Sequence, residues 1–136
     1  MFTGIVETQG IIKKIIEKGT NKIILDAYNA NPSSMKLAIE NFARLQSDKK
    51  ILMLGAMAEL GNESLQEHET IINLIKQHHW NNVILVGGDF LKINHPYRIF
   101  SNSKEAASWF KEQNIEDSYI LVKGSRSTQM EKLIEN

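Results

Sequence analysis

The chain has 136 residues, of which 42% are hydrophobic and 24% charged, so we expect one globular domain with a substantial core. Sixteen basic residues balance sixteen acidic ones, which argues against a nucleic-acid-binding or polybasic membrane-surface protein. Without cysteine there are no disulfides or thiolate metal sites, and no apolar run approaches the roughly 18 residues of a membrane helix. With no signal-peptide pattern at the N-terminus, we expect a cytoplasmic protein.

The first seven residues, Met1-Phe2-Thr3-Gly4-Ile5-Val6-Glu7, resemble the N-terminal signature of the riboflavin synthases. The likeness fades after Gly10. A riboflavin synthase needs two similar β-barrel halves, and this chain has no internal repeat. We therefore interpret residues 1–10 as a segment of doubtful origin, either a chance likeness or a sequence joined at a gene boundary. The domain proper is expected to span residues 11–136.

From Gly10 onward the chain alternates strand and helix patterns. The expected strands cover residues 11–16 (at an edge of the sheet), 22–28, 50–54, 82–86, 97–100 and 118–122. The expected helices cover residues 33–46, 64–79, 103–113 and 128–134, and the second opens with a capping box, Ser64-Leu65-Gln66-Glu67. Continuous Ile/Leu/Val runs are typical of strands covered on both faces. The pattern predicts an α/β fold: a Rossmann-like, mostly parallel sheet of five to six strands with helices on both faces.

A polar group follows the strand over residues 22–28, where open α/β sheets bind ligands. Asp26 can accept hydrogen bonds from ribose hydroxyls, and the Tyr28 ring can stack on adenine. The amides of Asn29 and Asn31 can bond to base edges or phosphate oxygens. These four residues are our candidate nucleotide-binding set. Asn31 has an alternative role as the N-cap of a helix that begins with Pro32.

A second candidate is the glycine-bounded loop Gly55-Ala56-Met57-Ala58-Glu59-Leu60-Gly61, with Ser64 and His68 on the helix after it. Its glycines predict special dihedrals or a close backbone approach. One interpretation gives Glu59 a role at the site, and the other has it only tie backbone amides. For His68 we favour a hydrogen bond that supports the loop.

The third candidate is Lys123-Gly124-Ser125-Arg126, which follows a strand and precedes a helix pattern. Arg can hold a carboxylate through two hydrogen bonds, and helix N-terminal amides add to the positive field. The anion could be a carboxylate or a nucleotide phosphate. In the alternative interpretation, Arg126 is a surface residue paired with Glu131 or Glu135.

Other chemistry is not indicated. Gly19-Thr20-Asn21-Lys22 lacks the glycine before the lysine and the Ser/Thr after it that a phosphate loop needs. The adjacent His78 and His79 point to different helix faces, and no carboxylate has ligand spacing to them or to His95. We therefore predict no metal site and no catalytic residue in this chain.

The string Asp-Ala-Tyr-Asn-Ala-Asn-Pro-Ser-Ser-Met, residues 26–35, resembles the opening of the C-terminal domain of the Mur ligases. It is most similar to the MurF branch, which adds D-alanyl-D-alanine to UDP-N-acetylmuramoyl-tripeptide. The loop from Gly55 to Gly61 and the element from Lys123 to Arg126 resemble the family in order and spacing, over roughly residues 10–136. Ala56 stands where the family usually has Asp, which puts a carboxylate role there in doubt.

The resemblance implies a complete enzyme in which ATP phosphorylates the tripeptide carboxylate and the amine of D-alanyl-D-alanine displaces phosphate, in peptidoglycan precursor synthesis. ATP and Mg²⁺ would be its cofactors. Asp26, Tyr28, Asn29 and Asn31 would meet ATP, and Lys123, Ser125 and Arg126 would hold the dipeptide. The partners would be a central ATPase domain and an N-terminal UDP-sugar-binding domain. This chain, without an intact phosphate loop, would be a lid that binds no cofactor tightly and is inactive alone.

Two alternatives remain at this point. Another Mur ligase or folylpolyglutamate synthase would share the domain type, although the Tyr-Asn-Ala-Asn-Pro and Lys-Gly-Ser-Arg strings favour the MurF branch. A stand-alone nucleotide or small-anion binding module is the other, and it should bind its ligand without partner domains.

Overall fold

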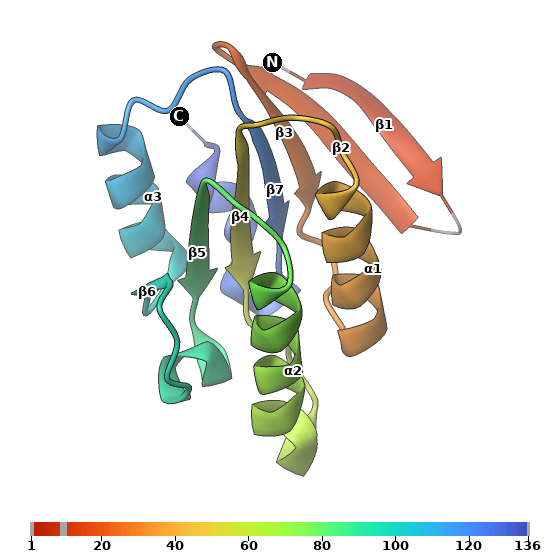
Figure 1. Ribbon diagram of the computed structural model, residues 1–136, viewed down its shortest axis with the longest axis vertical. Coiled ribbons are helices and arrows are strands. Elements are labelled where there is room, and N and C mark those ends of the chain that lie inside the picture. The colour runs from red at the N-terminus through yellow and green to blue at the C-terminus, as the bar shows by residue number, and fades with distance from the viewer. Residues whose placement is uncertain (1, 9–10, 136) are drawn as a thin grey trace.

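The computed structural model describes residues 2–8 and 11–135, with side chains from residue 14 onward. Within these ranges seven strands form one sheet in the order β1-β2-β3-β7-β4-β5-β6 (Figure 1). The strands are β1 (Phe2–Thr8), β2 (Ile11–Lys18), β3 (Asn21–Asp26), β4 (Lys50–Gly55), β5 (Asn82–Val86), β6 (Arg98–Phe100) and β7 (Tyr119–Lys123). The helices are α1 (Pro32–Ala43), α2 (Ser64–Lys76) and α3 (Ser103–Glu112).

Five of the strands, β3, β7, β4, β5 and β6, run parallel, which confirms the predicted Rossmann-like fold class. The first two strands add an antiparallel hairpin beside β3. Residues 11–16 were expected at the sheet edge, and this is wrong because β1 pairs with β2 on its outer side. The sheet is larger than expected for the same reason. The turn between β2 and β3 is made at Gly19, whose φ of 61° suits glycine.

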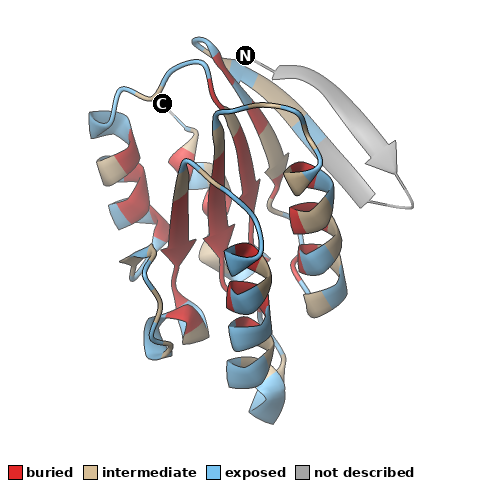
Figure 2. Ribbon diagram, viewed as in Figure 1, coloured by how far each residue is buried: buried red, intermediate tan, exposed pale blue. Residues whose placement is uncertain are grey.

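Alternate side chains of the strands pack into two separate cores, one on each face of the sheet. Helices α1 and α2 cover one face, and α3 with the C-terminal turns covers the other (Figure 1). Along β7, Leu121 belongs to the first core, whereas Ile120 and Val122 belong to the second. Figure 2 shows the buried residues concentrated in the central strands and on the inner faces of the helices. The parallel strands therefore end at one exposed edge, beside the N-termini of the helices.

Helices α1 and α2 both begin close to where the sequence predicts, but only α1 has the predicted cap. Asn31 is the N-cap of α1: its Oδ1 accepts from Ser34 N at 2.8 Å, and Ser34 Oγ accepts from Asn31 N at 3.0 Å. The predicted capping box at Ser64 is wrong, because Glu63 is the N-cap of α2 and makes no side-chain cap hydrogen bond. A 3-10 turn, η1 (Gly61–Glu63), leads into α2 instead.

The expected helix over residues 128–134 is also wrong. Two 3-10 turns, η3 (Arg126–Thr128) and η4 (Met130–Leu133), are separated by Gln129 in the left-handed conformation, with φ 52°. After this break the Met130 side chain packs against Gly55, at the end of β4, and Gly124, just after β7. There a Cβ on Gly124 would lie 2.7 Å from Met130 Cγ and 2.9 Å from the Gly55 Cα. Both glycines therefore leave room for the Thr128 and Met130 side chains, and Gly124 also allows the close approach of the Gly55 backbone.

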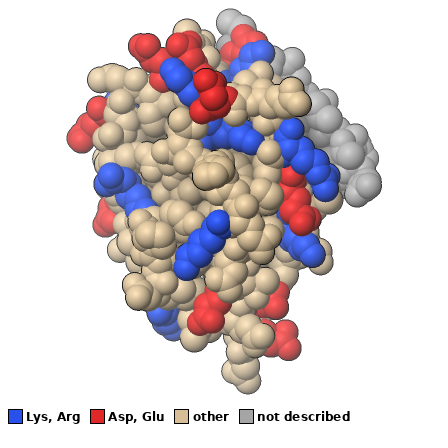
Figure 3. All heavy atoms as spheres, viewed as in Figure 1, with Lys and Arg blue, Asp and Glu red and all other residues tan. Residues whose placement is uncertain are grey.

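The surface of the domain carries both charge signs. Figure 3 shows basic and acidic side chains interspersed over the face that it presents. Among the described residues, no helix is both long and apolar enough to cross a membrane.

Candidate functional site

A buried ion pair links two of the motifs, although they lie far apart in the sequence. Asp26 ends β3 and Lys123 ends β7, and the parallel register places these two residues opposite each other. Lys123 Nζ donates to Asp26 Oδ2 and to the Asn29 carbonyl oxygen, both at 2.9 Å. Lys123 is 1% exposed and Asp26 5% exposed. The pair therefore anchors the loop after β3 to the centre of the sheet edge.

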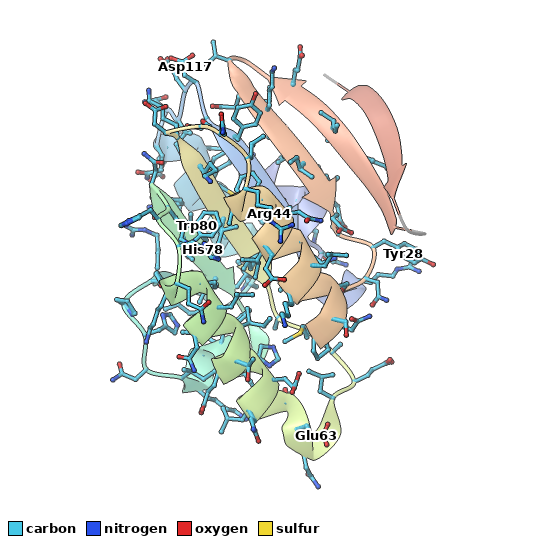
Figure 4. All side chains as sticks on the ribbon, turned by 45° about the vertical axis from the view of Figure 1, so that its right-hand side comes forward. Tyr28, Arg44, Glu63, His78, Trp80 and Asp117 are labelled. Atoms are coloured by element: carbon cyan, nitrogen blue, oxygen red, sulfur yellow. The ribbon has the colours of Figure 1, made fainter. Side chains whose placement is uncertain are left out.

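Tyr28 and Arg126 lie together above this anchor. The Arg126 guanidinium carbon is 5.0 Å from the centre of the Tyr28 ring, a cation–π contact. Tyr28 is 72% exposed and projects from the loop between β3 and α1 (Figure 4). Arg126 was alternatively expected to pair with Glu131 or Glu135. Neither ion pair is found among the described residues.

A pocket of about 750 Å³ opens at this edge and unites most of the predicted residues. All four candidate nucleotide-binding residues line it together with Lys123 and Arg126. Sequence reasoning missed several further lining residues: Lys14, Ser34, Gln129 and Glu131. Lys14 could have been found from its spacing, because it shares a strand face with Ile16 and Lys18. The site is thus built from the ends of β3 and β7, with β2 as a side wall.

Ser125 lies in a different pocket from Lys123 and Arg126. This second pocket, of about 430 Å³, is formed by the ends of β4, β5 and β7 and by the start of α3. Ser125 is buried, its Oγ lies 2.9 Å from Ser127 Oγ, and its amide donates to the Ala56 carbonyl oxygen at 3.1 Å. Lys104 and Lys132 also line this pocket. The three residues predicted to hold one ligand are therefore divided between two adjacent pockets.

The loop between β4 and α2 is held by His68, which is fully buried. Its Nε2 accepts from Met57 N at 3.0 Å, and its Nδ1 lies 2.7 Å from the Ser64 carbonyl oxygen. Because one ring nitrogen must accept and the other donate, this arrangement requires the neutral ring. The ring also meets Phe90 edge-on at 4.7 Å.

The other members of the loop differ in exposure. Ala56 is buried, and a Cβ on Gly88 would lie 2.3 Å from the Ala56 Cβ, so this site is tightly packed. Glu59 is exposed and has φ 62°. No hydrogen bond of its carboxylate is found in the described part of the chain.

Asp89 lies in the turn after β5, η2 (Gly88–Lys92), which packs against α2. The Ser64 hydroxyl hydrogen bond, together with Lys92 at 3.3 Å, holds the pKa of Asp89 below its ordinary value of 3.8. The ionised carboxylate therefore stabilises the fold above pH 3.8, and this contribution is lost as the pH falls through the lowered folded-state pKa. We expect Asp89→Asn to be less stable than the parent at neutral pH, with the difference vanishing in strong acid.

Urea unfolding of the parent and of Asp89→Asn, at neutral pH and well below pH 3.8, checks this expectation. Asp48→Asn, at an exposed position, is the control. A stability difference that persists unchanged in acid would contradict the proposed role of the carboxylate.

A metal site is not built into the described residues, because no group of three or more His, Asp or Glu side chains there could hold a metal ion. His78 lies against Trp80, with ring centres 6.0 Å apart, and His95 contacts Tyr97. The edge is therefore suited to binding through hydrogen bonds, charge and ring stacking.

Residues 13–126 match the family described as "Mur ligase, glutamate ligase domain". The UDP-N-acetylmuramoyl-tripeptide–D-alanyl-D-alanine ligase of Buchnera aphidicola (subsp. Acyrthosiphon pisum) is 36% identical over 141 residues, covering 98% of this chain and 31% of the relative. The ligase of the same name from Rickettsia prowazekii is 32% identical over 128 residues, covering 90% of this chain and 28% of the relative. The Buchnera alignment thus extends into residues 1–10, whose separate origin stays a prediction.

Solved structures are similar as well. MurF from Acinetobacter baumannii superposes with a TM-score of 0.72 at 29% identity, covering 88% of this chain and 28% of that one. The MurF ligase of Thermotoga maritima, solved in complex with ADP, superposes with a TM-score of 0.74 at 24% identity, covering 88% of this chain and 28% of that one. At this identity the likeness shows that the two proteins share the fold. The chain spans less than a third of the length of these relatives. This chain therefore belongs to the Mur ligase family and carries its glutamate ligase domain, as the three sequence motifs predicted.

Proposed function

We propose that this domain is the lid of an ATP-dependent, cytoplasmic ligase that adds D-alanyl-D-alanine to UDP-N-acetylmuramoyl-tripeptide. The relatives named for this activity are more than three times as long, so the reaction would need a central ATPase domain and a UDP-sugar-binding domain. The observation that carries the proposal is the Asp26–Lys123 pair, which joins motifs 97 residues apart at the mouth of one pocket. Lids of this kind complete a site by closing on it.

In the first pocket, the exposed Tyr28 ring offers a flat surface for an adenine base. Asp26 uses one carboxylate oxygen for Lys123, and the other is left to accept from a ribose hydroxyl. The Asn31 side-chain oxygen, Oδ1, caps α1, so the NH₂ group of the same side chain is left to donate to a ligand. Lys123 is buried and paired, and we therefore assign it to positioning the loop that carries Asn29.

In the second pocket, Ser125 would contact the dipeptide, with Lys104 and Lys132 attracting its carboxylate. The dipeptide amine would attack the acyl phosphate formed from ATP, and phosphate would leave as the amide bond forms. Arg126 lines the first pocket, and its sequence neighbours Ser125 and Ser127 line the second, so it would lie close to both ligands. Mg²⁺ would be held by the ATP phosphates and other parts of the ligase, since the described residues form no metal-binding cluster.

A chimera tests the proposal directly. The chain would replace the matching segment of the Escherichia coli ligase, to which it is 32% identical over 125 residues. We expect the chimera to release phosphate from ATP only when both the tripeptide substrate and D-alanyl-D-alanine are present. Tyr28→Ala and Arg126→Ala should each lower kcat/KM by roughly tenfold or more, because they misplace the reactants.

The control is Arg44→Ala, at the far end of α1 from Tyr28 (Figure 4). A chimera that folds and turns over, but is indifferent to both site variants, would overturn the proposal. Titration of the isolated chain with ADP addresses the alternative. Millimolar binding fits a lid that needs its partner domains, whereas micromolar binding would favour a stand-alone nucleotide-binding module.

A further inference from the structure

The face of β2 that looks toward η4 carries three long side chains at alternate positions, Lys14, Ile16 and Lys18. Two of them have clear structural roles. Ile16 packs in the second core, and Lys18 Nζ donates to the Ile134 carbonyl oxygen at 2.9 Å. Lys14 pairs in register with Leu25 of β3, and both residues line the first pocket. Lys14 is exposed, and no partner for its ammonium group is found among the described residues.

Five of the described residues that line the first pocket are charged. Asp26 and Lys123 neutralise each other at 2.9 Å. Lys14 and Arg126 are left as cations and Glu131 as an anion, none of them in an ion pair within 4.0 Å in the described structure. The Arg126 guanidinium stacks on the Tyr28 ring, and its in-plane N–H groups are left to donate hydrogen bonds. The two unpaired cations come from different elements, β2 and η3, and both line the same pocket.

We propose that Lys14 and Arg126 together bind the phosphate chain of the nucleotide whose base lies on the Tyr28 side of the pocket. The inference rests on the proposed function, and it adds a residue from the N-terminal hairpin to the site. Two separate cations that line one pocket suit an extended, multiply charged oxyanion better than a single carboxylate. Glu131 opposes the anion and sets a limit on the affinity. The hairpin of β1 and β2 would thereby take part in ligand binding as well as extending the sheet.

The test uses the isolated chain and amide chemical shifts in NMR titrations, which detect millimolar binding. The probes are tripolyphosphate, adenosine, ADP and D-alanyl-D-alanine. We expect tripolyphosphate and ADP to shift the amides of Lys14 and Arg126. Lys14→Gln and Arg126→Gln should each weaken tripolyphosphate binding roughly two- to fivefold, as expected for one exposed charge. Glu131→Gln should strengthen it by a similar factor, and added salt should weaken it.

The matched control is Lys49→Gln, an exposed lysine at the opposite end of the parallel strands. An unchanged affinity in Lys14→Gln, with Arg126→Gln weakened, would overturn the inference, as would shifts of Lys14 and Arg126 caused by D-alanyl-D-alanine alone. Adenosine shifts without any tripolyphosphate shifts would overturn the inference while leaving the proposed function standing. Tripolyphosphate binding with the expected variant pattern, but no response to adenosine, would support the oxyanion site and remove the base-binding part of the proposed function.

Discussion

Replacing Lys123 with methionine should lower the free energy of unfolding by about 3–5 kcal/mol, because the change strands a buried carboxylate. Asp26 is 5% exposed, and its carboxylate forms an ion pair with the Lys123 ammonium at 2.9 Å. The Asn29 carbonyl oxygen loses a donor at the same time. Since methionine fills a similar volume, the loss comes from the missing charge and hydrogen bonds, with little contribution from packing.

Urea unfolding followed by circular dichroism measures the effect, with Lys49→Met as the exposed control. The double variant Asp26→Leu/Lys123→Met removes both charges and should be more stable than Lys123→Met alone, as found when buried ion pairs are replaced by apolar residues. A loss below about 1 kcal/mol in Lys123→Met would show that the Asp26 carboxylate finds other solvation.

The His68→Leu variant should lose about 2–4 kcal/mol, because it leaves two polar backbone groups without their partner in a buried setting. Those groups are the Met57 N–H, now bonded at 3.0 Å, and the Ser64 carbonyl oxygen at 2.7 Å. Leucine keeps the apolar contact with Phe90, so the effect reports on the hydrogen bonds. The loop that carries Ala56 should loosen together with the second pocket.

The control is His79→Leu, which changes an exposed histidine just beyond the end of α2. Unfolding measurements on both variants separate the loss of the buried hydrogen bonds from the general effect of replacing histidine with leucine. His68→Gln, whose side-chain carbonyl can accept from the Met57 amide, should recover part of the stability. Equal stability of the two leucine variants would mean that the loop does not depend on His68.

Several features could be predicted from the sequence because their causes are local. Apolar runs marked the parallel strands, and Asn31 before Pro32 marked the start of α1. Other features depend on the strand order. Asp26 and Lys123 were each assigned to a ligand, and nothing local shows that β7 inserts beside β3 and makes them partners. Lys14 was missed because nothing local shows that its strand, expected at the edge of the sheet, pairs with β3 beside the site.

Two predictions about helices were wrong, the capping box at Ser64 and the helix over residues 128–134, and they share a physical reason. The Ser-Leu-Gln-Glu pattern at Ser64 fits a capping box, but Ser64 is already the first residue of α2, after the N-cap Glu63, and its hydroxyl lies 3.4 Å from His68 Nδ1. The last helix pattern fails because Met130 packs against Gly55 and Gly124 at the ends of two adjacent strands, and Gln129 takes a left-handed conformation before it. In both places tertiary contacts outweigh the local helix preference.

The loop of residues 27–31 is fixed at both ends and in its middle: Asp26 is held by Lys123, the Asn29 carbonyl oxygen by the same lysine, and Asn31 by Ser34. Ordering a free backbone costs about 1–2 kcal/mol per residue at room temperature, and here folding has already met that cost. A ligand that arrives at Tyr28 therefore meets a preorganised surface and loses little affinity to chain entropy. Closure of this domain over a partner would then proceed as a rigid-body step, with the flexible joint located elsewhere in the polypeptide.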